Sequence, residues 1–215
     1  MRVGLPALAA LVVLVWVPSA GASFAGYHQE GDSTLGIAFY GGDVDNDVTV
    51  SGNGAPFIVF TDIFEIEVET PPCVSGTNPM TAVCDRNDPI FGGYYSGQTL
   101  VELGPGNDRA VADQSGFRPI ISGRRGDDVI KATLDSTGIG ADGGPGTDRL
   151  IGGPGDDGFK DFDGGTTIRG RGGRDRIRAD GRSSPPDTID CGPGIDKAYV
   201  NATDSVVNCE KVTVS

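Results

Sequence analysis

The chain has 215 residues, of which 35 are Gly and 14 are Pro, and this content excludes an all-helical bundle because both residue types disfavour helix interiors. Asp and Glu outnumber Lys and Arg by 30 to 17, which gives a formal charge of −13 at pH 7. This acidic balance argues against a nucleic-acid partner, whose phosphates need Lys and Arg, and makes cations the expected counter-charge.

Residues 1–22 have the pattern of a secretory signal peptide. Arg2 gives a short positive start, Leu5 to Val17 is almost wholly apolar, and Ala20-Gly21-Ala22 is a small-x-small cleavage site. The apolar run is shorter than the roughly 20 residues that span a bilayer. We therefore expect cleavage after Ala22 and a secreted, extracellular protein with no membrane span after cleavage.

Residues 23–97 are expected to form a small β-rich domain. Asp47–Ser51 and Phe57–Phe60 are rich in β-formers and are joined by Gly52–Pro56, a combination typical of a hairpin. In Ile63–Glu69 apolar residues alternate with three Glu residues, which predicts a strand with one buried and one wet face. A metal or acid–base cluster of these Glu residues is the less favoured interpretation, because they share the solvent side of one strand.

The four cysteines, Cys73, Cys84, Cys191 and Cys209, follow the signal, and an even number in an exported chain suggests two disulfides. Spacing favours the local pairs Cys73–Cys84 and Cys191–Cys209, although four cysteines allow three pairings. Cys73 and Cys84 bracket a loop rich in Ser, Gly, Asn and Pro, so we expect their bond to close a hairpin tip rather than to cross a core.

From Leu103 onward the unit Gly-x-Asp-x-apolar recurs. Its aspartates are Asp108, Asp128, Asp148, Asp157, Asp175 and Asp196, with a degenerate copy at Asp187. Two tandem copies, at residues 143–151 and 152–160, match the nonapeptide Gly-Gly-x-Gly-x-Asp-x-U-x in full, where U is a large apolar residue.

These nonapeptides resemble the calcium-binding repeats of the RTX (repeats-in-toxin) family, whose motif they match completely. The order of signal, small cysteine-containing domain and repeats, and the final stretches Asp187–Lys197 and Asp204–Val212, are similar to secreted RTX-like calcium-binding proteins of actinobacterial type. The resemblance implies an all-β chain whose residues 98–215 form a parallel β-roll, an RTX-type solenoid, closed by the second disulfide. In such a roll two nine-residue halves make one coil, and each Ca²⁺ ion lies between the turns of adjacent coils.

The residue types in each repeat suit this chemistry. Glycine permits a tight turn in which carbonyl oxygens converge, and Asp, the shortest carboxylate, reaches a cation inside that turn. The expected Ca²⁺ ligands are the seven aspartates together with the turn residues Gly144, Gly146, Gly153 and Gly155. The apolar residue two positions after each Asp is expected to point into the core; these residues are Ala110, Ile130, Leu150, Phe159, Ile177, Ile189 and Ala198.

The spacing sorts the aspartates into two columns. One column is expected to hold Asp108, Asp128 and Asp148, and the other Asp157, Asp175 and Asp196, which gives four candidate sites between adjacent pairs. The 20-residue steps of the first column imply about two extra residues in the far loops, Ala112–Ser122 and Ala132–Asp142, which lack the motif and should bind no metal. Thr166 stands in line with the aspartates, so a site joining Asp148 to Asp187 ranks below the one in residues 143–157.

These features predict a non-enzymatic, exported calcium-binding protein whose repeats fold when Ca²⁺ binds outside the cell. One alternative is a surface adhesin or matrix module that uses calcium for rigidity and binds a surface or polysaccharide partner through residues 23–97. A secreted hydrolase is the less favoured alternative, because the sequence lacks the His-Glu-x-x-His and Gly-x-Ser-x-Gly motifs and its single histidine is His28.

Overall fold

The computed structural model describes residues 23–30, 34–52, 57–62, 66–68, 73–76, 80–85, 99–114, 118–133, 137–181 and 185–215. In these segments the chain forms strands and turns and no helix, so none could cross a membrane as an apolar helix. The expected signal peptide at residues 1–22 lies outside the described residues.

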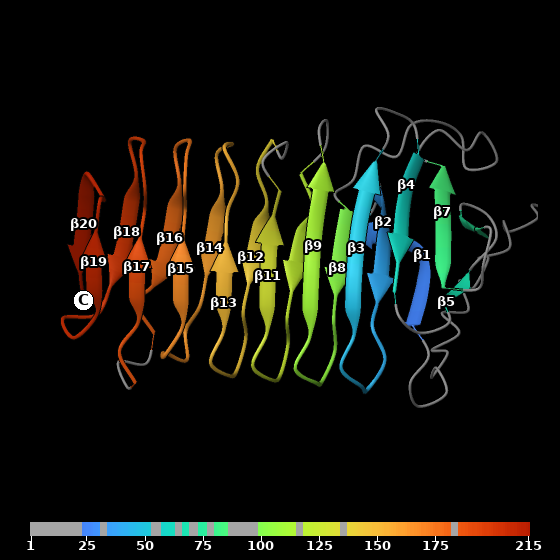
Figure 1. Ribbon diagram of the computed structural model, residues 1–215, viewed down its shortest axis with the longest axis horizontal. Coiled ribbons are helices and arrows are strands. Elements are labelled where there is room, and N and C mark those ends of the chain that lie inside the picture. Colours follow the sequence, from blue (N-terminus) through green and yellow to red (C-terminus); the bar gives the residue numbers. More distant parts are fainter. Residues whose placement is uncertain are drawn as a thin grey trace, which may run out of the picture.

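The strands form two sheets of ten strands each (Figure 1). Sheet A contains β1 (Ser23–Glu30), β2 (Thr34–Tyr40), β5 (Ile66–Val68), β8 (Thr99–Glu102), β10 (Ile120–Ser122), β12 (Gly140–Asp142), β14 (Gly158–Lys160), β16 (Arg176–Ala179), β18 (Lys197–Val200) and β20 (Lys211–Val214). Sheet B contains β3 (Asp47–Gly52), β4 (Phe57–Thr61), β6 (Cys73–Ser75), β7 (Thr81–Asp85), β9 (Arg109–Gln114), β11 (Val129–Ala132), β13 (Arg149–Ile151), β15 (Thr167–Arg169), β17 (Thr188–Asp190) and β19 (Ser205–Val207).

From β8 onward the chain alternates between the two sheets and builds a parallel β-solenoid, which confirms the predicted fold class. From β10 onward each strand pairs in parallel with the strand two elements earlier, so Ile130 lies beside Ala110 and Ile168 beside Leu150. The first of these steps is 20 residues and the second is 18, as the spacing predicted. Loops 103–108, 123–128 and 143–148 are equal in length. The two residues by which these coils exceed 18 therefore lie at the other edge of the solenoid, between β9 and β10 and between β11 and β12.

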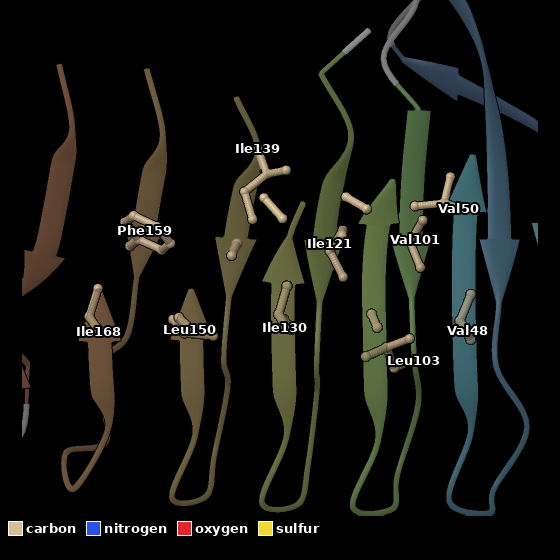
Figure 2. Packing of buried hydrophobic residues seen from close by; sticks show 14 of the residues in the cluster. Val48, Val50, Val101, Leu103, Ile121, Ile130, Ile139, Leu150, Phe159 and Ile168 are labelled. Atoms are coloured by element: carbon tan, nitrogen blue, oxygen red, sulfur yellow. The ribbon is translucent and has the colours of Figure 1, made fainter. Parts of the chain in front are cut away.

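The core lies between the sheets and is filled by one or two inward side chains from most of the described strands, whereas the last strand, β20, is exposed throughout. All seven residues predicted to point inward are buried, and Figure 2 shows Ile130, Leu150 and Ile168 following one another along the solenoid. The neighbours Arg109 and Arg149 are exposed. A single coil buries too little apolar surface to be stable, so each coil depends on the coils beside it.

The strands before residue 97 continue the same two sheets. β3 and β4 form the predicted antiparallel hairpin, and β2 and β3 pair in parallel with β8 and β9. The buried cluster includes Ala25, Phe39 and Phe60 together with the solenoid core. β5 lies within the strand expected at Ile63–Glu69, of which residues 63–65 and 69 and the side chains of β5 lie outside the described residues. The division into domains at residue 97 stays a prediction.

Both disulfides have the predicted pairing, Cys73–Cys84 and Cys191–Cys209. The prediction that the Cys73–Cys84 disulfide closes the tip of a hairpin was wrong about where the bond lies. Cys73 pairs with Cys84 across β6 and β7, on the far side of the hairpin from its tip, and both residues are fully buried in the core cluster. The bond therefore joins neighbouring strands inside the apolar core.

Candidate functional site

The repeat aspartates lie at the ends of loops along the two edges of the solenoid. At the first edge, loops lead from sheet A to sheet B and include residues 41–46, 103–108, 123–128, 143–148, 161–166 and 201–204. At the second edge, loops lead from sheet B to sheet A and include residues 152–157, 170–175, 191–196 and 208–210. The last residue of each loop immediately precedes a strand, so parallel pairing brings the equivalent residues of successive coils into line.

At the first edge these residues form a hydrogen-bonded ladder. Oδ1 of Asp128 accepts the backbone N–H of Asp108 at 2.8 Å, and Oδ1 of Asp148 accepts that of Asp128 at 2.8 Å. The ladder continues from the Asp148 N–H to Thr166 Oγ1 (3.1 Å), from the Thr166 N–H to Asp187 Oδ1 (2.9 Å), and from the Asp187 N–H to Asp204 Oδ1 (3.0 Å). Asp187 is thereby joined to the first column, with Thr166 between it and Asp148.

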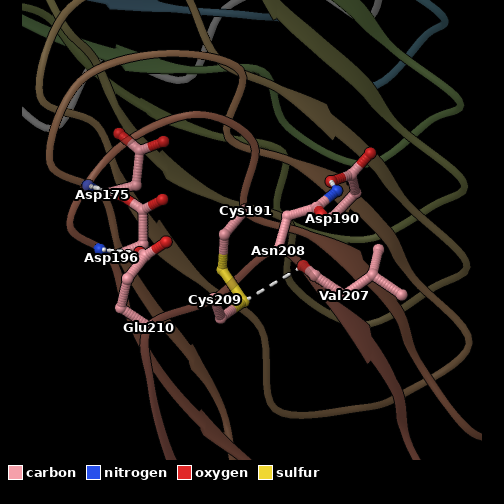
Figure 3. The surroundings of a disulfide bond; sticks show 8 residues. All are labelled: Asp175, Asp190, Cys191, Asp196, Val207, Asn208, Cys209 and Glu210. Carbon is pink, nitrogen blue, oxygen red and sulfur yellow. Dashed lines mark hydrogen bonds between the residues drawn. A yellow bond between two sulfur atoms is a disulfide. The ribbon is translucent and has the colours of Figure 1, made fainter.

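The second edge carries an equivalent ladder, part of which Figure 3 shows beside the Cys191–Cys209 bond. Asp157 Oδ1 accepts the N–H of Ile139 at 2.6 Å, Asp175 Oδ1 that of Asp157 at 2.8 Å, and Asp196 Oδ1 that of Asp175 at 2.7 Å. Glu210 ends the ladder by accepting the Asp196 N–H at 2.7 Å. The two groups of three aspartates that the spacing predicted are therefore brought into two separate lines.

In most of these aspartates the second carboxylate oxygen, Oδ2, is buried without a hydrogen-bond partner. This applies to Asp108, Asp128, Asp148, Asp175 and Asp196, each of which is at most 3% exposed. In Asp157 the second oxygen accepts the Gly153 N–H at 2.8 Å. A buried polar atom with no partner is rare and costly in a native fold, so five along two lines require an explanation.

These second oxygens point into the loops, toward backbone carbonyl groups. A Cβ placed on Gly123, the first residue of its loop, would collide with Asp128 Oδ2 and with the carbonyl oxygen of Gly143 in the next coil. At Gly152 the colliding atoms would be Asp157 Oδ2 and the Gly170 carbonyl oxygen. In these two loops only a glycine at the first position leaves space for the second carboxylate oxygen and a carbonyl oxygen of the next coil to lie so close.

Asn46, which starts the first ladder, reveals what this space accommodates. Its amide nitrogen Nδ2 takes the place of the second carboxylate oxygen, next to Gly41 at the start of the loop. It donates to three carbonyl oxygens, those of Gly42 (3.3 Å), Val44 (2.6 Å) and Leu103 (3.0 Å), and to Asp108 Oδ1 (3.1 Å). The loop interior is therefore lined by acceptors. An ionised carboxylate oxygen in the same place faces the same acceptors, and no hydrogen bond can form because neither side has a donor.

Burial also changes the acidity of the ladder carboxyl groups. It raises the pKa of Asp108, Asp148 and Asp175 to about 7, and that of Asp128 and Asp187 to about 6. Backbone N–H donors oppose this rise, while neighbouring carboxylates add to it. Burial raises the pKa of Asp157 and Asp196 as well. Ionised ladder aspartates are therefore unfavourable unless a positive charge enters the loops.

The turn glycines have distinct parts in these loops. Gly144 has φ = 94°, and a Cβ there would collide with the Arg124 carbonyl oxygen of the preceding coil. Gly146 also has positive φ, whereas Gly153 donates its N–H to Asp157 and a Cβ at Gly155 would meet the backbone of Thr137. Gly144, Gly146 and Gly155 thus lie where the backbones of adjacent coils approach closely, and Gly153 contacts a ladder carboxylate in its own loop.

The loop at residues 161–166 departs from the pattern. Thr166 supplies the neutral ladder acceptor, and Asp161 stands at the first loop position, where loops 123–128, 143–148, 152–157 and 170–175 have glycine. Asp161 Oδ1 accepts the Asp163 N–H at 2.9 Å, while its buried Oδ2 has no partner. Sequence reasoning missed Asp161, and also Asn46 and Asp204. The weaker signal Asx-x-Val, present in Asn46-x-Val48 and Asp204-x-Val206, could have found the last two.

The aspartates do not gather into a conventional side-chain metal cluster. Among the described residues no three Asp, Glu, His or Cys side chains converge on one point. A cation in these loops would take one or two carboxylate oxygens from the ladder and the rest of its ligands from backbone carbonyl groups, as hard cations commonly do.

No protein family model, curated protein or solved structure matches the chain. The resemblance to RTX-like proteins therefore depends on the sequence features described above, chiefly the two complete nonapeptides. The two disulfides indicate an oxidising, extracellular environment.

Proposed function

We propose that this protein binds calcium ions in the loops of both solenoid edges and that Ca²⁺ binding stabilises its fold outside the cell. The observation that carries this proposal is the line of buried Asp Oδ2 atoms that face carbonyl oxygens without a donor between them. The match of residues 143–160 to RTX nonapeptides and the signal-like residues 1–22 support it independently.

The donor set selects the kind of cation. Carboxylate and backbone carbonyl oxygens face the loop interiors. Ca²⁺ takes six to eight oxygen ligands in adaptable geometry, whereas Mg²⁺ requires a strict octahedron and keeps several waters. Zn²⁺ prefers Cys and His, and all four cysteines are held in disulfides. Calcium is therefore the ion that these residues suit best.

The binding residues have two separate roles. Oδ1 of each aspartate holds the coils in register by accepting an N–H. Oδ2 has no partner and is available to an ion in five of them, Asp108, Asp128, Asp148, Asp175 and Asp196. Adjacent aspartates give four candidate sites, between Asp108 and Asp128, Asp128 and Asp148, Asp157 and Asp175, and Asp175 and Asp196. A bound Ca²⁺ would supply the positive charge that favours ionised carboxylates, so binding and folding should be coupled.

The affinity should suit an extracellular module, with a dissociation constant of about 10⁻⁴–10⁻³ M. In this proposal calcium binding is the activity and no residue is catalytic. The solenoid would be less structured where calcium is scarce and fully formed where it is abundant.

Titration calorimetry and circular dichroism of the chain lacking residues 1–22 test the proposal, with CaCl₂ and MgCl₂ compared at neutral pH. We expect calcium to release or absorb heat at several sites and to increase the β-sheet signal over that in chelator. The double variant Asp128→Asn/Asp175→Asn, with one change in each ladder, should lose most of the bound calcium. Asp113→Asn, at an exposed strand position, is the matched control and should bind as the unchanged chain does. Identical spectra in chelator and in calcium, together with no binding heat, would exclude the proposal.

A further inference from the structure

The outer surface of sheet A carries a line of exposed cations across its C-terminal strands. Arg176, Lys197 and Lys211 lie directly beside one another in β16, β18 and β20. Arg118 extends this line beyond Arg176, because its guanidinium lies over Gly158: a Cβ on Gly158 would be 3.4 Å from Arg118 Nη2. The same nitrogen donates a hydrogen bond to the Ile139 carbonyl oxygen at 3.3 Å.

A second, shorter line runs parallel to the first. Lys160 pairs with Arg178 on the next strand, and the two cationic groups lie over the ring of Phe162, at 5.0 and 5.4 Å from its centroid. The guanidinium of Arg176 lies 5.6 Å from the ring centroid of Tyr199. We call the six cations Arg118, Lys160, Arg176, Arg178, Lys197 and Lys211 the basic face.

Few carboxylates neutralise this face. Asp142 pairs with Lys160 at 2.7 Å and Asp180 with Arg178 at 3.5 Å. In the part of the chain that the structure describes, Arg176, Lys197 and Lys211 form no ion pair. The six cations of the basic face thus form two ion pairs with carboxylates, and the other four form none among the described residues, although the whole chain has a formal charge of −13.

Such a line is unfavourable by itself, because like charges directly opposite in neighbouring strands destabilise a sheet, and strands are only about 4.8 Å apart. The solenoid fold does not require such a line of cations. On the outer surface of sheet B, Arg149 is followed in register by Thr167, Thr188 and Ser205, so no cation line forms there. An extended partner with regularly repeated negative charge would remove the repulsion on sheet A.

We propose that the basic face binds a linear acidic polysaccharide, one that carries carboxylate or sulfate groups along its length. The partner is a polysaccharide rather than a single-stranded nucleic acid because nucleic-acid platforms use free aromatic faces to stack bases. Here cations already lie over the rings of Phe162 and Tyr199. The two disulfides also indicate an extracellular environment. The basic face consists of cations on sheet A and beside it, whereas the proposed calcium ligands are ladder carboxylates and backbone carbonyl groups, so the two kinds of binding use different residues.

The test compares two variants of equal net charge. Arg176→Ala/Lys197→Ala/Lys211→Ala removes three cations from the basic face. Arg109→Ala/Lys131→Ala/Arg149→Ala removes three from the outer surface of sheet B and is the matched control. Binding to dextran sulfate, neutral dextran and a thymidine oligonucleotide is measured by calorimetry over a range of salt concentrations. Circular dichroism checks that each variant is folded under the same conditions.

The unchanged protein and the control should bind dextran sulfate and leave neutral dextran unbound. The basic-face variant should bind at least about tenfold more weakly at low salt, and the slope of log Kd against log salt should fall by about 2 to 3, roughly one for each lost contact. Equal weakening of both variants would overturn the proposal, since only net charge would then matter. Tighter binding of the oligonucleotide than of dextran sulfate would overturn the choice of polysaccharide, and no binding to either polyanion would overturn the site itself.

Discussion

Replacing Asp148 with Asn separates the two roles of a ladder carboxylate. Asp148 is 2% exposed, and its Oδ1 accepts the Asp128 N–H at 2.8 Å, a bond that an amide oxygen can keep. The new amide nitrogen would lie where Asn46 has its own, facing carbonyl oxygens that it can use as acceptors. The substitution thus removes the charge and preserves the shape and the ladder.

The expected energy follows from the pKa of the carboxyl group. Raising the pKa of Asp148 from 3.8 to about 7 makes its ionised form about 4 kcal/mol less favourable in the folded protein, at about 1.4 kcal/mol for each tenfold change in proton affinity. The folded-state pKa lies above the unfolded-state value. Protonation therefore stabilises the calcium-free fold fully below pH 3.8, and this contribution is lost as the pH rises through about 7.

Without calcium, Asp148→Asn should be about 2–4 kcal/mol more stable than the unchanged protein near pH 8, because neighbouring carboxylates share part of the full cost. The difference should vanish near pH 4, where Asp148 is protonated. With millimolar Ca²⁺ near pH 8 the order should reverse, because the variant has lost a ligand.

Denaturant unfolding followed by circular dichroism, in chelator and in calcium at the two pH values, measures these differences. Asp113→Asn is again the control and should change none of them. The reasoning is refuted if Asp148→Asn destabilises the calcium-free protein equally at both pH values, or if calcium stabilises the variant as much as the unchanged protein.

Three further changes test the loops and the C-terminal coil by the same unfolding and titration measurements. Gly144→Ala should cost at least about 2 kcal/mol of folding stability, because the φ of Gly144 is 94° and the new methyl group would collide with backbone atoms. The control Gly172→Ala should cost less than about 1 kcal/mol, because the atom nearest to its new methyl group would be 3.6 Å away. Equal costs would contradict the loop geometry. Thr166→Asp should lower calcium-free stability near neutral pH and add at least one bound calcium in a titration, since it completes the carboxylate line; unchanged stoichiometry would show that the loop at 161–166 cannot hold an ion. Cys191→Ala/Cys209→Ala should destabilise the protein by about 3 kcal/mol, because the bond closes a loop with a sequence separation of 18; a loss below about 1 kcal/mol would show that the last coils are held by other contacts.

The repeat region could be predicted from sequence because its period is local. A fixed spacing of Asp and of the apolar residue two positions later determines both the register of parallel strands and the inward side chains. Ile130 and Leu150 were assigned to the core on that basis and are fully buried. The columns followed from the same arithmetic, which needs no knowledge of distant contacts.

The features that were missed depend on contacts that the period does not encode. Asn46 joins the first ladder 62 residues before Asp108, across an inserted segment, so no spacing argument links them. Strands β10 and β12 carry no turn aspartate, and only their pairing with β8 and β14 explains their position. The buried location of Cys73 and Cys84 likewise depends on packing against the N-terminal strands, which a list of cysteine spacings does not contain.

Asn46 and Thr166 together show why the remaining ladder residues are aspartates. A ladder of hydrogen bonds needs one acceptor per coil, and Thr166 provides it without charge. The loop interior needs a donor, and the Asn46 amide provides that without a metal. Neutral residues therefore meet every requirement of the turn, at no cost in buried charge. The chain nevertheless places Asp at these turns, where burial raises the pKa and leaves an oxygen without a partner. Only the second oxygen distinguishes Asp from Asn in this position, and the proposed Ca²⁺ ion would be the partner that makes its ionised form favourable.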